Sequence, residues 1–249
     1  MKQTTLLITT SLALTSSAFA ATLIGEDFES YTGGTPSGWL KVEDSVFSAG
    51  AGLNGSSTSL QLGITSNGNN NSALRNNFSS SGAITSTFSL QFDFMQLSTG
   101  NDPSNGTRQM NFTLRDDSGS VINWRVLWDG VNDGTLQYFD GAWQNMSTQN
   151  ELINQSDTYR VLLTGDITDS YSISVTNLTD STIVGGQSGI SDYQSSFTDL
   201  TELRFERGRS TADYLVDNVL LTNVPEPQSF AALLGLGALL AVATRRRHS

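Results

Sequence analysis

Apolar and polar residues alternate along most of the chain between residues 21 and 223, with the period of two that is typical of half-buried β-strands. The clearest run is Phe88, Leu90, Phe92 and Phe94, each separated by a polar or acidic residue. The same pattern recurs at residues 60–64, 110–114, 122–128, 136–138, 159–163, 171–175, 203–205 and 219–221. We find no convincing stretch with a helical period, so the pattern predicts a succession of short strands.

The segments between these runs are rich in turn-forming residues, such as Asn67-Gly68, Asp133-Gly134 and Asp140-Gly141. Strands joined by such turns predict an all-β fold, an antiparallel sandwich of two sheets with one buried face each. Trp124 and Trp128 share an apolar face and are expected in its core. Two polar insertions, residues 66–72 and 98–107, are either binding loops or disordered segments.

The first twenty residues, 1–20, have the pattern of a secretory signal peptide. Lys2 precedes two short apolar stretches, and Ala18-Phe19-Ala20 is a small-x-small cleavage site. Threonines interrupt a stretch that is already too short to span a membrane comfortably, which disfavours an uncleaved anchor. We therefore expect export by the Sec machinery and cleavage by signal peptidase before Ala21.

The C-terminal segment, residues 224–249, has three ordered elements. Pro225, Glu226 and Pro227 are followed by an apolar run over residues 230–243 and then by Arg245, Arg246 and Arg247. The apolar segment is near the lower limit of roughly 17 residues for a transmembrane helix. Because arginines stay on the cytoplasmic side, residues 21–223 are expected outside the inner membrane.

This order of elements resembles the PEP-CTERM sorting signal of Gram-negative bacteria. The resemblance implies that the chain is held transiently in the inner membrane and that an exosortase-like enzyme removes the tail. The protein would then reach the cell surface or the extracellular matrix. Between the two tags lies one predicted domain, residues 21–223.

Composition narrows the chemistry of that domain. The chain of 249 residues has no cysteine, and its single histidine, His248, lies in the tail. Disulfides, Ser-His-Asp or Cys-His catalysis and histidine-ligated metal hydrolysis are therefore excluded in the domain. Residues 21–224 carry nine basic and 23 acidic residues, a net charge of −14. This charge disfavours nucleic acid as a partner and is compatible with a divalent cation, although solubility alone explains it.

A second resemblance lies at the two ends of the domain. Asp27-Phe28-Glu29 and the Gly-Trp pair ending at Trp39 open it, and residues 214–219, with Asp217 and Asn218, close it. This arrangement resembles jelly-roll carbohydrate-binding modules and their concanavalin A-like and laminin-G-like relatives. The resemblance implies adjacent first and last strands and a structural Ca²⁺ held by Glu29 and Asp217. Asn218 stands where these modules often have a second Asp, and the alternative is that Glu29 and Asp217 simply face solvent.

Glycoside hydrolysis is the enzyme class that this composition still allows, because it needs only two facing carboxylates. The Glu-x-Asp-x-x-Glu run of concanavalin-like glucanases is absent. Glu202, Arg204 and Glu206 share one strand face, which favours a salt-bridged solvent face instead. We therefore predict that the protein is not an enzyme.

Sugar binding would use aromatic rings stacked on pyranose faces, with polar side chains beside them. The candidates outside the regular core pattern are Trp39, Trp143 and Tyr193, each of which is either a ligand-binding residue or a core or edge residue. We expect a structural or adhesive component of the extracellular polysaccharide layer. The alternative is a carbohydrate-binding module that recognises one particular glycan.

Overall fold

The computed structural model describes residues 20–42, 45–64, 72–97, 108–128, 134–193, 197–208 and 213–224. The predicted signal peptide, the sorting residues Pro225 to Arg247 and both polar insertions lie outside these residues, except that Ser72 begins a strand. Residues Ala20–Val224 form one compact unit. Within the described residues no helix is long and apolar enough to cross a membrane.

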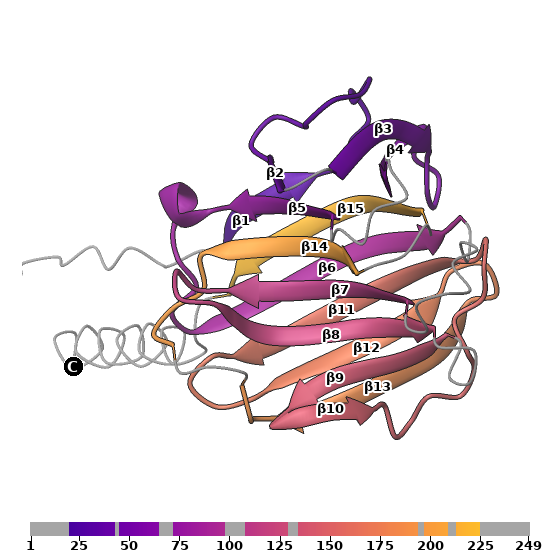
Figure 1. Cartoon of the computed structure of the whole chain (residues 1–249). Helices are drawn as coiled ribbons and strands as arrows, with labels where there is room; N and C mark the ends of the chain where they lie inside the picture. Colours follow the sequence, from indigo (N-terminus) through magenta and orange to yellow (C-terminus); the bar gives the residue numbers. More distant parts are fainter. Residues whose placement is uncertain are drawn as a thin grey trace, which may run out of the picture. The chain divides into compact units, whose positions relative to one another are not determined.

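The described residues form two antiparallel sheets, which confirms the all-β jelly-roll sandwich (Figure 1). The eight-stranded sheet contains β13 (Thr182–Ile190), β12 (Tyr171–Asn177), β11 (Thr158–Asp166), β6 (Thr87–Gln96), β15 (Tyr214–Asn223), β4 (Thr58–Ile64) and β3 (Ser45–Ala51) in this order, and β1 (Ala21–Glu26) also pairs with β15. The seven-stranded sheet contains β10 (Ala142–Asn145), β9 (Thr135–Asp140), β8 (Ser120–Trp128), β7 (Arg108–Arg115), β14 (Glu202–Gly208), β5 (Ser72–Asn77) and β2 (Leu40–Val42). The only helical element among the described residues is the 3-10 turn η1 (Ser79–Ser81).

Aromatic rings from the two inner faces fill the space between the sheets. Phe92 of β6 stacks on Phe112 of β7 with ring centroids 4.7 Å apart, and Phe112 stacks on Trp124 of β8 at 4.2 Å. Trp124 and Trp128 are 1% and 4% exposed, so their predicted core position is confirmed. Offset stacking of this kind stabilises the core beyond the burial of apolar area alone.

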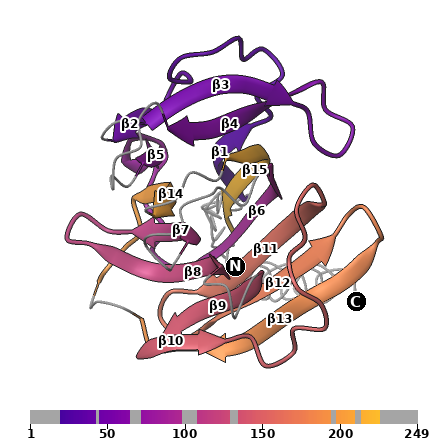
Figure 2. The same ribbon diagram turned by 45° about the vertical axis from the view of Figure 1, so that its right-hand side comes forward.

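The first and last strands of the domain lie side by side, as the jelly-roll resemblance implied (Figure 2). Ala21 of β1 is the cross-strand partner of Asn223 of β15. Strand β15 also pairs with β6 along its length and with β4 at Tyr214–Val216, so it is an interior strand of its sheet.

The predicted turn at Asp140-Gly141 joins β9 and β10 into a hairpin. Gly141 has a φ of 69°, a left-handed conformation that a side chain would disfavour. The turn pairs Trp143 with Phe139 and Asn145 with Gln137 across the two strands. It thereby places an aromatic pair and an amide pair at one edge of the seven-stranded sheet.

Candidate functional site

An aromatic and cationic cluster lies on the outer face of the seven-stranded sheet at its β10 edge. Arg125 alternates with the buried residues Trp124 and Val126 of β8, so its side chain points away from the core. Its Cζ atom lies 3.9 Å from the centroid of the Trp143 ring, within the range of a cation–π interaction. Phe139 meets Trp143 edge to face at 5.9 Å, and the indole of Trp143 is half-buried.

Amide side chains from the neighbouring strands complete this cluster. Arg125 donates from Nε to Gln137 Oε1 at 2.8 Å and from Nη1 to Gln109 Oε1 at 2.7 Å. Gln137 donates in turn to Asn145 Oδ1 at 2.7 Å. Residues of four adjacent strands, β7 to β10, thus form one polar surface around the indole. We call Gln109, Arg125, Gln137, Trp143 and Asn145 the Arg125 platform.

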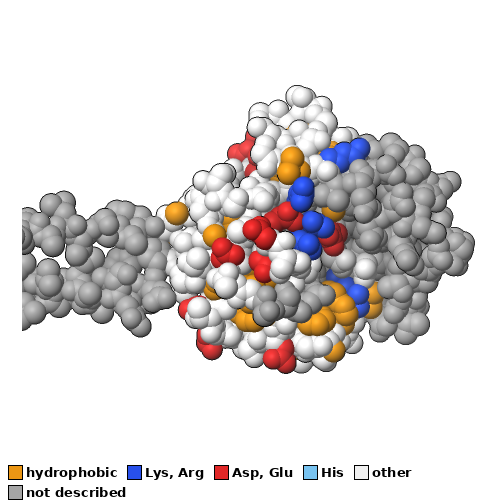
Figure 3. Space-filling view, turned by 60° about the vertical axis from the view of Figure 1, so that its left-hand side comes forward, with side chains coloured by type: hydrophobic (Ala, Val, Ile, Leu, Met, Phe, Trp, Pro, Cys, Tyr) orange, Lys and Arg blue, Asp and Glu red, His pale blue; other side chains and the backbone are white. Residues whose placement is uncertain are grey.

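Charged side chains gather further along the same face, where Figure 3 shows basic and acidic groups together. Glu202 of β14 is surrounded by Arg75, Arg115 and Arg204 at 3.3, 3.2 and 3.0 Å, and Arg204 also pairs with Glu206 at 2.9 Å. The predicted Glu-Arg-Glu salt bridges are therefore confirmed. Glu202 is only 7% exposed, however, because three guanidinium groups cover it, so it does not face solvent as expected.

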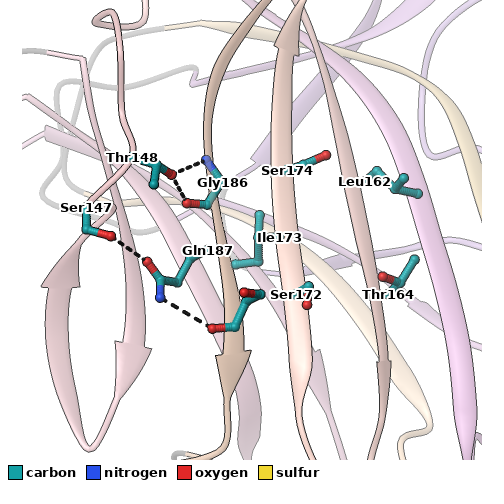
Figure 4. A pocket seen from close by; sticks show the side chains of 10 residues that line it. Ser147, Thr148, Leu162, Thr164, Ser172, Ile173, Ser174, Gly186 and Gln187 are labelled. Carbon is teal, nitrogen blue, oxygen red and sulfur yellow. Dashed lines mark hydrogen bonds between the residues drawn. The ribbon is translucent and has the colours of Figure 1, made fainter.

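A second surface feature is a depression of about 380 Å³ on the outer face of the eight-stranded sheet (Figure 4). Small polar side chains line most of it, namely Ser147, Thr148, Thr164, Ser172, Ser174, Gln187 and Ser188, with Leu162, Ile173 and Gly186. Ser147 donates to Gln187 Oε1 at 3.0 Å, and the Thr148 hydroxyl accepts from Gly186 N at 3.1 Å. The lining contains hydroxyl and amide groups but neither charged nor aromatic side chains.

The three aromatic candidates for sugar binding lie in different environments. Trp39, which precedes the β2 edge of the seven-stranded sheet, is 3% exposed and packs against Phe28 and Phe205 at 6.1 and 5.8 Å. Its assignment as a ligand-binding residue is wrong, because neither ring face is accessible. Tyr193 packs against the core beside Phe197 and donates to Asp166 O at 3.1 Å. Burial, with Asp166 nearby, raises the pKa of Tyr193 to about 12. Only Trp143 lies on an outer sheet face.

The two proposed calcium ligands, Glu29 and Asp217, both contact the loop between β3 and β4. Glu29 accepts from Ser57 N at 2.7 Å and from the Ser57 hydroxyl, and Asp217 accepts from Leu53 N at 3.2 Å and from the Ser56 hydroxyl. Carboxylate and hydroxyl oxygens are suitable Ca²⁺ ligands. Among the described residues, however, no three acidic or histidine side chains converge into a metal-binding group. Calcium binding therefore stays a prediction.

Asp217 also belongs to a buried polar cluster. It lies opposite Asp93 in the register of β15 and β6, and both residues are 0% exposed. Arg160 of β11 donates from Nε and Nη2 to the two Asp93 oxygens at 2.7 and 2.9 Å. Asn218, in a left-handed conformation with a φ of 52°, donates to Asp93 Oδ2 at 3.0 Å. An aspartate at position 218 would place a third carboxylate beside a single arginine, which explains the amide found there.

Sequence reasoning missed the amide and arginine members of the Arg125 platform. The alternation along β8 and β9 does place Arg125 and Gln137 on the outer face, because their neighbours Trp124 and Tyr138 face the core. That signal identifies an outer face, but it cannot identify which residues meet there, because the register between strands is a tertiary property.

Comparisons with known proteins support two conclusions, one about the C-terminal tail and one about the fold of the domain. The PEP-CTERM protein-sorting motif matches residues 223–247. The chain thus carries a bacterial signal for export and for surface or extracellular sorting, with processing by an exosortase-type enzyme. No curated protein gives a significant sequence match.

Solved structures are similar to the chain in fold, at low sequence identity. The globular domain of T. cruzi calreticulin has a TM-score of 0.53 at 11% identity, covering 91% of this chain and 98% of that one. The CBM2 module of the evolved Dit protein of Lactobacillus casei BL23 phage J-1 has a TM-score of 0.52 at 14% identity, with 84% and 98% covered. A carbohydrate esterase of the Shiga toxin-encoding bacteriophage phi24B has a TM-score of 0.53 at 11% identity, with 83% and 100% covered. At these identities the likeness shows the sandwich fold and no activity.

Proposed function

We propose that the sorted domain is a non-catalytic, adhesive component of the extracellular polysaccharide layer. In this proposal, it holds polysaccharide on the outer face of the seven-stranded sheet. The observation that carries the proposal is the Arg125 platform, in which a half-buried tryptophan lies against a guanidinium group and amides at the edge of a jelly-roll sandwich. Sorting to the cell surface would bring this face into contact with secreted glycans.

The platform combines the two kinds of contact that sugars require. The apolar face of a pyranose ring packs on an indole, while its hydroxyl groups need donors and acceptors around the ring. Trp143 would supply the first contact with the part of its ring that Arg125 leaves uncovered, and Gln137 and Asn145 would supply the second. Because the platform spans four strands on an open sheet face rather than a closed pocket, it suits an extended chain better than a single small sugar.

Two features support a non-catalytic role. Glycoside hydrolysis needs an accessible carboxyl group whose pKa is raised so that it can act as an acid. Burial raises the pKa of Asp217, but this carboxyl is 0% exposed and bound to the loop between β3 and β4, so substrate cannot reach it. Glu202, in turn, is covered by three arginines.

Retention on insoluble polysaccharides, followed by competition with soluble fragments, tests the proposal. We expect saturable retention that falls at least about tenfold in Trp143→Ala, with little change in melting temperature, because the indole lies outside the core. The matched control is Gln187→Ala in the depression on the opposite sheet, which should retain full binding.

Three other outcomes would change the assignment. Loss of retention in Gln187→Ala alone would move the site to the hydroxyl-lined depression. Tight binding of a single glycan and of no other would favour the alternative, a module for one particular ligand. No retention on any polysaccharide would contradict the proposed function.

A further inference from the structure

Four of the nine basic residues of this acidic domain lie on one sheet face. Within residues 21–224 the net charge is −14. Yet the outer-facing strand positions of the described seven-stranded sheet carry four arginines, Arg75, Arg115, Arg125 and Arg204, against two glutamates, Glu202 and Glu206. These strand positions therefore carry a net charge of +2 in a domain that is otherwise strongly negative.

The four arginines are not equivalent. Arg75, Arg115 and Arg204 each form an ion pair with Glu202, and Arg204 forms a second with Glu206. No described acidic side chain pairs with Arg125, whose hydrogen-bonding partners are the neutral amides of Gln109 and Gln137. Burial lowers the pKa of Arg125. An arginine nevertheless remains protonated, so the described residues leave its charge without a counter-charge.

The guanidinium group of Arg125 is also fixed in an orientation that can bind a further partner. The two amide oxygens and the indole fix its plane, while Nη2 makes no hydrogen bond among the described residues. A guanidinium fork of this kind matches the two oxygens of a carboxylate, and the resulting charge-assisted hydrogen bonds are stronger than neutral ones. Fixing the fork in advance reduces the entropy that binding would otherwise cost.

We infer that Arg125 is a carboxylate-binding residue and that the polysaccharide held by this face is acidic, bearing uronate groups. The inference rests on the proposed function and specifies its ligand class. A uronate sugar packed on the part of the Trp143 ring that Arg125 leaves uncovered would place its carboxylate beside Arg125, and this carboxylate would supply a counter-charge. The rest of the domain repels polyanions, so binding would be confined to this face.

The test uses the full chain in detergent and a matched pair of probes, oligogalacturonate and the same oligosaccharide with its carboxylates methyl-esterified. We expect the acidic form to bind more tightly, with an affinity that falls as salt is raised. Arg125→Gln should weaken acidic binding by about 10- to 100-fold and leave the ester form nearly unchanged. Arg125→Lys should recover only part of the loss, because it restores the charge without the fork.

The outcomes separate the inference from the proposed function on which it rests. Equal affinity for both probes, unchanged in Arg125→Gln, would overturn the acidic-ligand inference and leave polysaccharide binding intact. Failure of both probes together with every other polysaccharide would overturn both. Melting temperatures of the two Arg125 variants close to that of the unaltered protein would show that the loss arises at the binding surface.

Discussion

Removing Arg160 tests whether the buried cluster around Asp93 is held together by charge. Arg160→Gln deletes the guanidinium group that binds both oxygens of Asp93, at 2.7 and 2.9 Å. Asp93 is 0% exposed and lies opposite Asp217, so it would remain as a buried carboxylate beside another one. Asn218 would still donate one hydrogen bond, at 3.0 Å.

The size of the effect follows from the burial of the two partners. Breaking a fully buried ion pair costs about 3–5 kcal/mol. The Arg160 side chain is 31% exposed, which lowers the expected loss in free energy of unfolding to about 2–4 kcal/mol at pH 7. In a domain of this length each kcal/mol corresponds to about 2–4 °C in melting temperature. Urea unfolding followed by tryptophan fluorescence would measure the loss directly.

Two comparisons show whether charge is the cause. Asp93→Asn should cost less than Arg160→Gln, because the freed guanidinium can reach water, and the double variant should recover much of the loss. A cost below about 1 kcal/mol for Arg160→Gln, or a double variant no more stable than Arg160→Gln, would refute this reasoning.

Four further predictions concern stability, metal binding and processing. Burial raises the pKa of Asp217, so its contribution to stability is present below its unfolded pKa and is lost as the pH rises through the folded one. Asp217→Asn, which mimics the protonated form, should therefore cost less at pH 7 than at pH 4 in urea unfolding, and equal costs would contradict the assignment. Trp39→Ala should destabilise the domain by about 3–5 kcal/mol in the same assay, whereas Trp143→Ala should cost less than about 1 kcal/mol. A reversed order would show that the environments of the two tryptophans are wrongly assigned. If Ca²⁺ binds at Glu29, calcium added after EDTA treatment should release or absorb heat and raise the melting temperature, and Glu29→Gln should abolish both effects. The absence of both effects in the unaltered protein would exclude the site. Mass mapping of the protein from its native host should find a new N-terminus after the signal peptide and a C-terminus near the Pro-Glu-Pro motif, whereas full-length protein in the inner membrane would contradict sorting.

The strands that the sequence predicts well are those whose inner face is strictly apolar. Phe88, Leu90, Phe92 and Phe94 of β6 are all at most 2% exposed, because burial of one sheet face imposes a period of two. Strand β13 carries no such signal. It contains two adjacent glycines and several polar residues, and Val184 and Ile190 are its only buried apolar side chains. Its strand conformation is set by pairing with β12, a tertiary contact.

The candidate site was predictable only in part, since its contacts join residues far apart in the chain. Trp39 and Trp143 both fall outside the regular alternation of the sequence, and only the fold buries the first and leaves the second on an outer face. Asp217 meets Leu53, which lies 164 positions earlier in the chain. The resemblance to jelly-roll modules correctly placed the two ends of the domain together, but the amide partners of Arg125 depend on strand register, which no local pattern encodes.

The pairing of Ala21 with Asn223 also has a consequence for the order of events during secretion. Strand β15 is the last of the described strands along the chain, yet β1, β4 and β6 all need it as a partner. Such long-range pairing folds slowly, so the sandwich can close only when nearly the entire domain has emerged. The match to the sorting motif begins at Asn223, the last residue of that strand. Completion of the fold and arrival of the processing signal are therefore coupled in time, and a chain truncated before β15 would be left with exposed, aggregation-prone sheet edges.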